Sequence, residues 1–282
     1  MRLLRLKSLL PASLKGPLRA GRERLFTLSL RAAASEQGLD PLIARLGAVV
    51  DPTDQYTTMK MDTEFLRAKV SAQHAFQVAL ASPALPSDGG TVVDIGDSSG
   101  AHTLYLKHFN PECRARFLSV NLDPEAVRKI RSRSLEAVQS RAEDLEAAGV
   151  QADVFLLFET LEHIADPFHF LHDLATKTKC RRLVVTVPYV RRSRLGLHHI
   201  RQGLKEPVGA ERVHLLELCP QDLRLLFAHA GWHVETERIY RQYPLRSPLR
   251  ATRALWADWD FEGFYGAVLV PDERWSSLYQ DW

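Results

Sequence analysis

The sequence predicts a doubly wound, mostly parallel α/β domain with a helical extension at its amino terminus. From about residue 91 onward, short apolar stretches alternate with segments of helical periodicity, and Pro and Gly separate the two. One of the apolar stretches ends in an acid and turns through a glycine-rich loop at residues 94–100. Alternating strands and helices of this kind form parallel sheets with helices on both faces.

The expected elements follow one another in a regular order. A helix is expected over 63–81, where apolar residues recur at helical spacing without an internal Gly or Pro. Strands are expected at 91–95, 116–121, 137–139, 153–158, 182–187, 232–240 and 264–270. Further helices are expected directly after Gly100 and from Pro124, Pro167 and Pro220, since Pro is favoured at the first position of a helix. The aromatic residues near the carboxyl end, Trp256, Trp259, Phe261, Phe264, Tyr265 and Trp275, are expected in the core.

Charge and length divide the chain into a basic, mainly helical extension over 1–87 and a domain over 88–282. Eight basic residues precede Glu36, with Glu23 as the only acid among them, namely Arg2, Arg5, Lys7, Lys15, Arg19, Arg22, Arg24 and Arg31. The leucines between them predict a helix packed on its own domain. The alternative is an arm that makes peripheral contact with an anionic membrane surface.

Several classes of protein are disfavoured by the composition. Cys113, Cys180 and Cys219 show no C-x-x-C spacing, so neither a zinc site nor a disulfide framework is expected. No stretch approaches eighteen consecutive apolar residues, and we expect a cytoplasmic protein. The net charge is only +3 and no RNA-binding aromatic motif is present, so we expect neither DNA nor RNA as a partner.

The most informative segment is the loop after the first expected strand. Asp94 ends that strand and can accept a hydrogen bond from a ligand ammonium group, while Gly96 and Gly100 allow a tight turn and a helix that begins close to a ligand. Dinucleotide-binding loops instead need G-x-G-x-x-G, and Ser98 stands where the second glycine would be. A dinucleotide site is therefore disfavoured.

The segment 93–100 resembles the first motif of the class I S-adenosylmethionine (SAM)-dependent methyltransferases, with Ser98 in place of the middle glycine. The resemblance continues through 117–126, 142–145, 153–167, 183–188 and 227–232 in the order and spacing of that family. It implies a seven-stranded, Rossmann-like sheet, SAM as the cofactor and methyl transfer as the activity.

The resemblance also implies which residues bind the donor. Asp94 would contact the methionine ammonium group directly or through water, and Gly96, Ser98 and Gly100 would form the loop beneath the ligand. Asn121, with Leu122 beside it, stands where the family has an acid that binds the ribose hydroxyls. The remaining donor-binding candidates are Ala142 and Glu143 near the adenine and Glu159 after the fourth strand.

Glu162 and His163 follow the fourth strand, where the donor and the acceptor meet in this family. His163 is the best placed general base, with Glu162 beside it, and the alternative is that the pair only fixes the loop by hydrogen bonds. A further alternative comes from ubiquinone-type O-methyltransferases and RNA 3′-terminal ribose methyltransferases, in which similar residues bind a divalent cation. By that resemblance Glu159, Glu162, His163 and His214 would be the ligands.

The acceptor is less well specified than the donor. A basic, His-containing stretch over 191–205 would attract an anionic acceptor, although a solvated loop accounts for it equally. We expect transfer to an oxygen, with nitrogen or carbon as alternatives, of a small-molecule or glycan-like acceptor. A hypothesis of another class is a scaffold that has this fold but binds no donor, motivated by Ser98 and Asn121.

Overall fold

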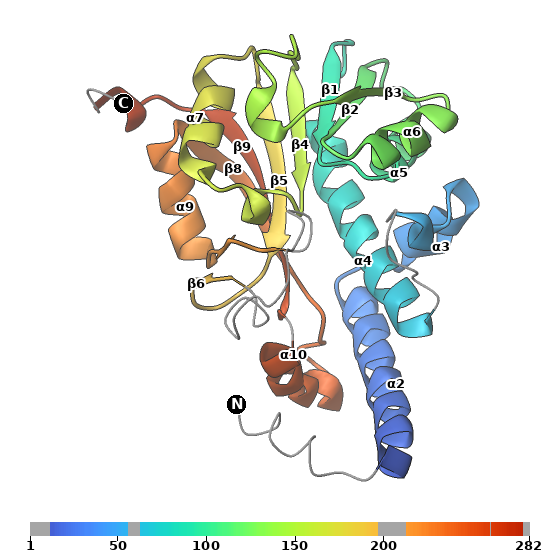
Figure 1. Ribbon diagram of the computed structural model, residues 1–282. Helices are drawn as coiled ribbons and strands as arrows, with labels where there is room; N and C mark the ends of the chain where they lie inside the picture. Colours follow the sequence, from blue (N-terminus) through green and yellow to red (C-terminus); the bar gives the residue numbers. More distant parts are fainter. Residues whose placement is uncertain (1–11, 56–62, 197–212, 260, 279–282) are drawn as a thin grey trace.

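The computed structural model describes residues 12–55, 63–196, 213–259 and 261–278 (Figure 1). The leucines and arginines that precede residue 12 lie outside this range, as do the basic residues between 197 and 212. No helix within the described residues has the length and apolar character needed to cross a membrane.

The domain is built on one seven-stranded sheet in the order β3-β2-β1-β4-β5-β9-β8. The strands are β1 (Thr91–Ile95), β2 (Arg116–Asn121), β3 (Glu136–Gln139), β4 (Val154–Phe158), β5 (Arg182–Pro188), β8 (Trp232–Arg241) and β9 (Gly263–Pro271). The first five are parallel to one another, and β9 runs antiparallel to both β5 and β8. The predicted fold, a seven-stranded and mostly parallel sheet, is confirmed.

Helices cover both faces of the sheet (Figure 1). One face packs against α4 (Glu64–Ala81), α5 (Ala101–Phe109) and α3 (Asp40–Val49), with Val92 and Val184 among the strand residues that it buries. The other face packs against α7 (Pro167–Thr176) and α9 (Pro220–His229), and Val93 and Val185 belong to it. Because successive residues of a strand point to opposite faces, strands that are apolar throughout are buried on both sides.

Side-chain caps begin the helices where the sequence places them. The Asp123 carboxylate accepts a hydrogen bond from the Glu125 amide at 2.9 Å and so caps α6 (Pro124–Ser132), which packs against β2 and β3. The hydroxyl of Thr63 accepts from the Leu66 amide at 3.2 Å at the start of α4. Asp123 thus acts as the cap of a helix.

Beyond the carboxyl ends of the parallel strands lie α2 (Ala12–Glu36) and α10 (Arg253–Trp259), which Figure 1 shows in blue and red below the sheet. The rings of Phe26 and Trp256 lie 4.2 Å apart between them. Trp256 is fully buried, as predicted, whereas Trp275 is 46% exposed, so its prediction as a core residue was wrong. Trp275 lies after the last strand, where its ring contacts that of His229 at the end of α9.

Candidate functional site

The loop after β1 requires both of its glycines. Gly96 and Gly100 have φ values of +88° and +77°, in the left-handed region that disfavours side chains. A Cβ atom at Gly96 would lie 2.3 Å from the Oγ1 atom of Thr160, which itself donates a hydrogen bond to the carbonyl oxygen of Ile95 at 3.1 Å. The loop after β1 therefore rests directly on the loop after β4.

A buried carboxylate holds the loop from within. Asp97 accepts hydrogen bonds from the amides of Ser99 (3.0 Å) and Gly100 (2.8 Å) and from the hydroxyl of Ser119 (2.7 Å). All three partners donate, so this side chain is held as a carboxylate and ties the loop to β2. Sequence reasoning did not single out Asp97, although an acid followed by small residues before a helix is a capping pattern.

Asp94 lies at one end of a chain of buried, hydrogen-bonded side chains. Its Oδ2 atom lies 3.0 Å from Nδ1 of His102, in the first turn of α5, and Nε2 of His102 lies 3.1 Å from Oε1 of Gln77 on α4. The amide nitrogen of Gln77 donates in turn to Oγ1 of Thr186 on β5 at 3.2 Å. All four side chains are at most 5% exposed. These hydrogen bonds thus join four elements, β1, α5, α4 and β5.

The two ionisable groups of this chain shift each other's protonation. Burial, together with the nearby Asp97 carboxylate, raises the pKa of Asp94 to about 6. Burial alone would lower the pKa of His102, but the charge of Asp94 and its hydrogen bond, with a contribution from Asp97, raise that pKa above its usual value. The shift of His102 thus favours its imidazolium form beside the Asp94 carboxylate.

The end of β2 carries a buried polar residue, Asn121, followed by an exposed apolar one, Leu122. The Asn121 amide nitrogen donates to the Asp97 carbonyl oxygen at 3.0 Å, and its Oδ1 atom accepts from the Asp123 amide at 2.8 Å. Its neighbour Leu122 is 48% exposed, which is unusual for a leucine at the end of a buried strand. An exposed apolar side chain there offers a flat contact for an aromatic base.

The other predicted donor residues are less tightly fixed. Ser98 and Ala142 are half-buried, and the exposed Glu143 contacts Arg141 at 3.2 Å. Glu159 follows β4 with a φ of +49°, an uncommon conformation for a residue with a side chain. Such a strained position often marks a functional loop, because surrounding structure must maintain it.

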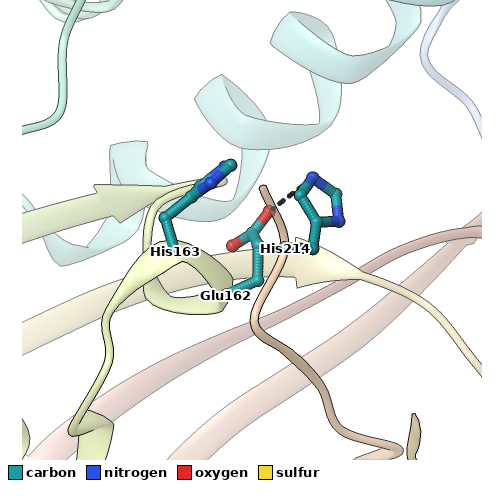
Figure 2. Close-up of side chains that lie close together, drawn as sticks. All are labelled: Glu162, His163 and His214. Carbon is teal, nitrogen blue, oxygen red and sulfur yellow. Dashed lines mark ion pairs between the residues drawn. The ribbon is translucent and has the colours of Figure 1, made fainter. Parts of the chain in front are cut away.

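Glu162, His163 and His214 lie together beside the end of β4 (Figure 2). One ligand atom from each lies within 4.8 Å of the others, and Nε2 of His214 lies 4.0 Å from Oε1 of Glu162. The Nδ1 atom of His163 lies 2.9 Å from the carbonyl oxygen of Val213, and Nδ1 of His214 lies 2.8 Å from Oε1 of Glu217. In the neutral form each imidazole is thus oriented with Nε2 as the basic nitrogen.

Glu162 is 2% exposed, and neither of its carboxyl oxygens makes a hydrogen bond. Burial, and then the neighbouring Glu159 and Glu217, raise the pKa of Glu162 well above its usual value. Glu217 is ionised beside it, since His214 and Arg194 both bond to its carboxylate and lower its pKa despite its burial. Sequence reasoning missed Glu217, three residues after His214, as the group that orients that ring.

The structure places the predicted metal ligands only in part. Three of them, Glu162, His163 and His214, form one cluster among the described residues, and Glu159 is not a member of it. Divalent cations in proteins bind combinations of carboxylate and imidazole, and histidine ligands usually donate their second ring nitrogen to a carboxylate or a carbonyl oxygen. Both histidines of the cluster are held in this way, His163 through its Nδ1 atom by the carbonyl oxygen of Val213 and His214 through its Nδ1 atom by the carboxylate of Glu217.

Two of the described arginines on the expected acceptor side are already paired. Arg191 bonds to the buried carboxylate of Glu262, and Arg194 bonds to that of Glu217. Arg192 is exposed, and the rest of the basic stretch, from residue 197 onward, lies outside the described residues. The prediction that this stretch attracts an anion therefore has less support than the charge of the sequence suggested.

The site fits a cationic, amino-acid-bearing nucleoside in two respects. The Oδ1 atom of Asp94 is buried and makes no hydrogen bond, and an unsatisfied buried carboxylate oxygen is costly unless a donor reaches it. Leu122 lies exposed at the neighbouring strand end, where a base could pack. Asp94 and Asn121 at the ends of their strands, and Gly96, Ser98 and Glu159 in the loops that follow, all lie at the carboxyl edge of the sheet, where ligands bind in folds of this type.

Comparison with known proteins shows what the chain is similar to. Residues 93–180 match the model of the methyltransferase domain family. A protein described as a sarcosine dimethylglycine methyltransferase from Galdieria sulphuraria aligns with a TM-score of 0.54 at 11% identity, over 74% of this chain and 88% of that one. The structure of the 4+2 cyclase SpnF aligns with a TM-score of 0.53 at 13% identity, over 86% and 97% of the two chains.

A chain from the complex between the Trm112 methyltransferase activator of Haloferax volcanii and a methyltransferase aligns with a TM-score of 0.50 at 19% identity, over 71% of this chain and 91% of that one. A search of curated proteins found no significant match to the sequence. At such low identities the structural likeness establishes the fold alone.

Proposed function

We propose that this chain, which belongs by its domain and its fold to the class I SAM-dependent methyltransferases, transfers the methyl group of SAM to an oxygen atom of a small-molecule acceptor. The observation that carries the proposal is the position of His163 in the loop after β4. Its Nδ1 atom is held 2.9 Å from the carbonyl oxygen of Val213, so the neutral ring has Nε2 as its proton acceptor.

In methyl transfer the donor supplies the reactive group, and the protein contributes alignment, exclusion of water and a base. Bound SAM supplies an electrophilic methyl group on a sulfonium sulfur, and the product is S-adenosylhomocysteine (SAH). The residues of the chain must align the acceptor with that methyl group, exclude water and take a proton from an acceptor hydroxyl. His163 accepts that proton at Nε2, which leaves the acceptor oxygen with the electron pair that forms the new C–O bond while the C–S bond breaks.

The contact between Gly96 and Thr160 supports this assignment of the base. It brings the loop that carries Asp94 against the loop that carries His163, so a donor bound at the first loop would lie near the second. An oxygen acceptor is favoured over nitrogen or carbon because an alcohol or a phenol must lose a proton during the transfer. His163 would accept that proton. Whether the acceptor is anionic or glycan-like remains a prediction.

The experiment is to incubate the protein with methyl-labelled SAM and a panel of phenols, carboxylic acids, sugars and amines, with SAH formation as the readout. We expect labelled product from a hydroxyl acceptor, as a base-stable ether. A base-labile methyl ester or a methylamine would contradict the assignment of oxygen chemistry through a deprotonated hydroxyl. His163→Ala should lower kcat by a factor of about 10²–10⁴ and leave SAH affinity unchanged.

His169→Ala provides the matched control, since His169 is an exposed histidine on α7 that bonds to Asp166. The same protein samples test the scaffold alternative. That hypothesis has one structural argument, since a cyclase shares the fold and the fold alone does not dictate methyl transfer. A protein that binds no SAH at millimolar concentration would favour the scaffold.

A metal-assisted transfer is the second candidate, and the cluster in Figure 2 favours it. Both carboxyl oxygens of Glu162 are buried without hydrogen bonds, and Nε2 of His214 lies toward that carboxyl group while Glu217 holds its other ring nitrogen. A divalent cation there would lower the pKa of Glu162 and of an acceptor hydroxyl.

Two measurements decide this candidate. Mn²⁺ binding, followed by electron paramagnetic resonance without any acceptor present, should be lost in Glu162→Gln and kept in Glu143→Gln, an exposed control. EDTA should abolish turnover, and Mg²⁺ or Mn²⁺ should restore it. Turnover that is insensitive to EDTA, together with absence of Mn²⁺ binding, would remove the metal from the mechanism.

A further inference from the structure

His102 joins the first motif to the helix that precedes the sheet. The residue lies in the first turn of α5 and is 4% exposed. Its two ring nitrogens each face an oxygen atom, Oδ2 of Asp94 at 3.0 Å and Oε1 of Gln77 at 3.1 Å. The amide of Gln77 is oriented by its other end, where Nε2 donates to Oγ1 of Thr186.

Two acceptors on one imidazole require two N–H groups. A neutral imidazole has one donor and one acceptor nitrogen, so only the imidazolium form can donate to both oxygens at once. A buried positive charge is stable only beside a negative one, and the Asp94 carboxylate supplies it. The same carboxylate raises the pKa of His102 against the effect of burial.

The surrounding cluster still lacks one positive charge. Asp97 is a carboxylate, because its three partners all donate hydrogen bonds to it. Asp94 and Asp97 carry two negative charges and His102 carries one positive charge, so one negative charge remains in a buried site. The oxygen of this pair of carboxylates that has no partner is the buried Oδ1 atom of Asp94, which makes no hydrogen bond. A cationic group of a ligand would balance the charge.

We propose that His102 is the positioning residue of the donor site: its imidazolium, anchored by Gln77, holds one oxygen of Asp94 so that the other faces the α-ammonium group of SAM or SAH. The inference rests on the donor assignment made above and deepens it. It makes α4, through Gln77, a part of the donor site, although α4 precedes the sheet in the sequence and was expected to belong to the extension.

The charged and titratable neighbours of His102 define its pH response. Asp94 and Asp97 face it from the β1 end of the domain, and from α4 it meets Gln77 and the ring of His74, at 5.1 Å between centroids. Burial lowers the pKa of His74 well below its usual value, so that ring is neutral. On the β4 side the contact is the ring of Phe158, at 4.8 Å. When pH rises through the pKa of His102, the ring loses a proton and must give up one of its two bonds.

The protonation state is tested first, on the unaltered protein. In ¹⁵N-histidine-labelled protein at pH 7.5, nuclear magnetic resonance should show both ring nitrogens of His102 protonated, with the signal assigned by its loss in His102→Gln. A single unprotonated nitrogen, which a flipped Gln77 amide would produce, overturns the proposal. This measurement needs neither donor binding nor turnover.

Ligand binding then separates positioning from a structural role. Calorimetry should show SAH affinity at pH 7.5 reduced about tenfold in His102→Gln, and an alkaline loss of affinity in the unaltered protein that is absent from that variant. Methylthioadenosine, which has the nucleoside and the sulfur but no amino-acid group, should bind both proteins equally at every pH. Equal weakening of both ligands, or no weakening of SAH, would overturn the positioning role.

Two further variants keep the test decisive if His102→Gln is unstable. Gln77→Glu strengthens the acceptor for Nε2, so the alkaline loss of SAH affinity should move to higher pH, whereas Gln77→Leu removes that acceptor and should move it to lower pH. His108→Gln, an exposed histidine on the same helix, is the control. If the unaltered protein binds methylthioadenosine but not SAH, the ammonium contact fails while the nucleoside site stands. If it binds neither ligand, the donor assignment itself fails.

Discussion

Thr160 occupies the space that a side chain at Gly96 would need, because its Oγ1 atom lies 2.3 Å from the position of a Cβ atom there. The two residues follow neighbouring parallel strands, β1 and β4, and the same Oγ1 atom donates a hydrogen bond to Ile95 at the end of β1. The close approach of the two loops therefore depends on the absence of a side chain at residue 96.

The first prediction concerns this contact. Gly96→Ala adds a steric clash to the strain of a left-handed backbone, whereas Gly89→Ala adds the strain alone, since Gly89 has a φ of +97° and nothing within 4 Å of its Cβ position. Chemical denaturation should show a loss of about 1–2 kcal/mol for Gly89→Ala and about 1–3 kcal/mol more for Gly96→Ala. Equal losses would mean that Thr160 moves away without cost.

Asp97 offers a test of the hydrogen bonds inside the loop. Asp97→Ala leaves the Ser99 and Gly100 amides and the Ser119 hydroxyl without their acceptor, and each buried unsatisfied group costs about 1–3 kcal/mol. Asp97→Asn keeps an oxygen for the two amides, and Ser119 can accept from the new amide group. Thermal and urea unfolding should therefore rank Asn well above Ala, and a reversed order would contradict this account.

Asp94 is expected to control the affinity of the donor. Asp94→Ala should weaken SAH binding by more than tenfold, or about 1.4 kcal/mol and above, as measured by calorimetry. Asp88→Asn is the matched control, because Asp88 is an exposed acid that precedes the same strand at its opposite end. An unchanged affinity in Asp94→Ala would show that the donor binds elsewhere.

Proton release should accompany donor binding near pH 6. The pKa of Asp94 is raised to about 6 by burial and by Asp97, so the carboxyl group is partly protonated there in the free protein. A bound ammonium group favours the carboxylate and lowers that pKa, so binding expels a proton and affinity rises as pH increases toward and past 6. Calorimetry in buffers of different ionisation enthalpy measures the release, which Asp94→Asn should abolish. Proton uptake on binding at pH 6 would contradict the assignment of Asp94 as the group that contacts the ammonium.

Most of the sheet was predictable because its strands are short apolar stretches with clear breaks. The ends of β1 and β2 agree with the prediction, and those of β4 and β8 differ by one residue. The pair β6 (Arg194–Leu195) and β7 (Leu216–Glu217) was not predicted, since two residues show no periodicity. The motif residues were placed correctly at the carboxyl edge, because the sequence itself marks the strand ends.

The partners of those motif residues could not be predicted. Gln77 contacts His102 although the two residues are 25 positions apart in the sequence. The sequence around Gln77 indicates only that the residue lies within a long helix, α4. Nothing local distinguishes a buried polar residue on α4 from a solvated one, since tertiary packing decides the difference. The same holds for Glu217, which orients His214 only because the fold brings His214 and Arg194 next to its carboxylate.

The position of α4 limits how the protein can be shortened. Phe76 and Leu80 of this helix belong to the same buried apolar cluster as Val92, Leu156 and Val184 on one face of the sheet. A chain that began at residue 88 would present that strip of sheet to water and to other chains, and it would also take the bonding partner from His102. Any attempt to isolate the part of the molecule that matches the methyltransferase domain model should therefore begin before Glu64, or it will yield aggregates in place of an active domain.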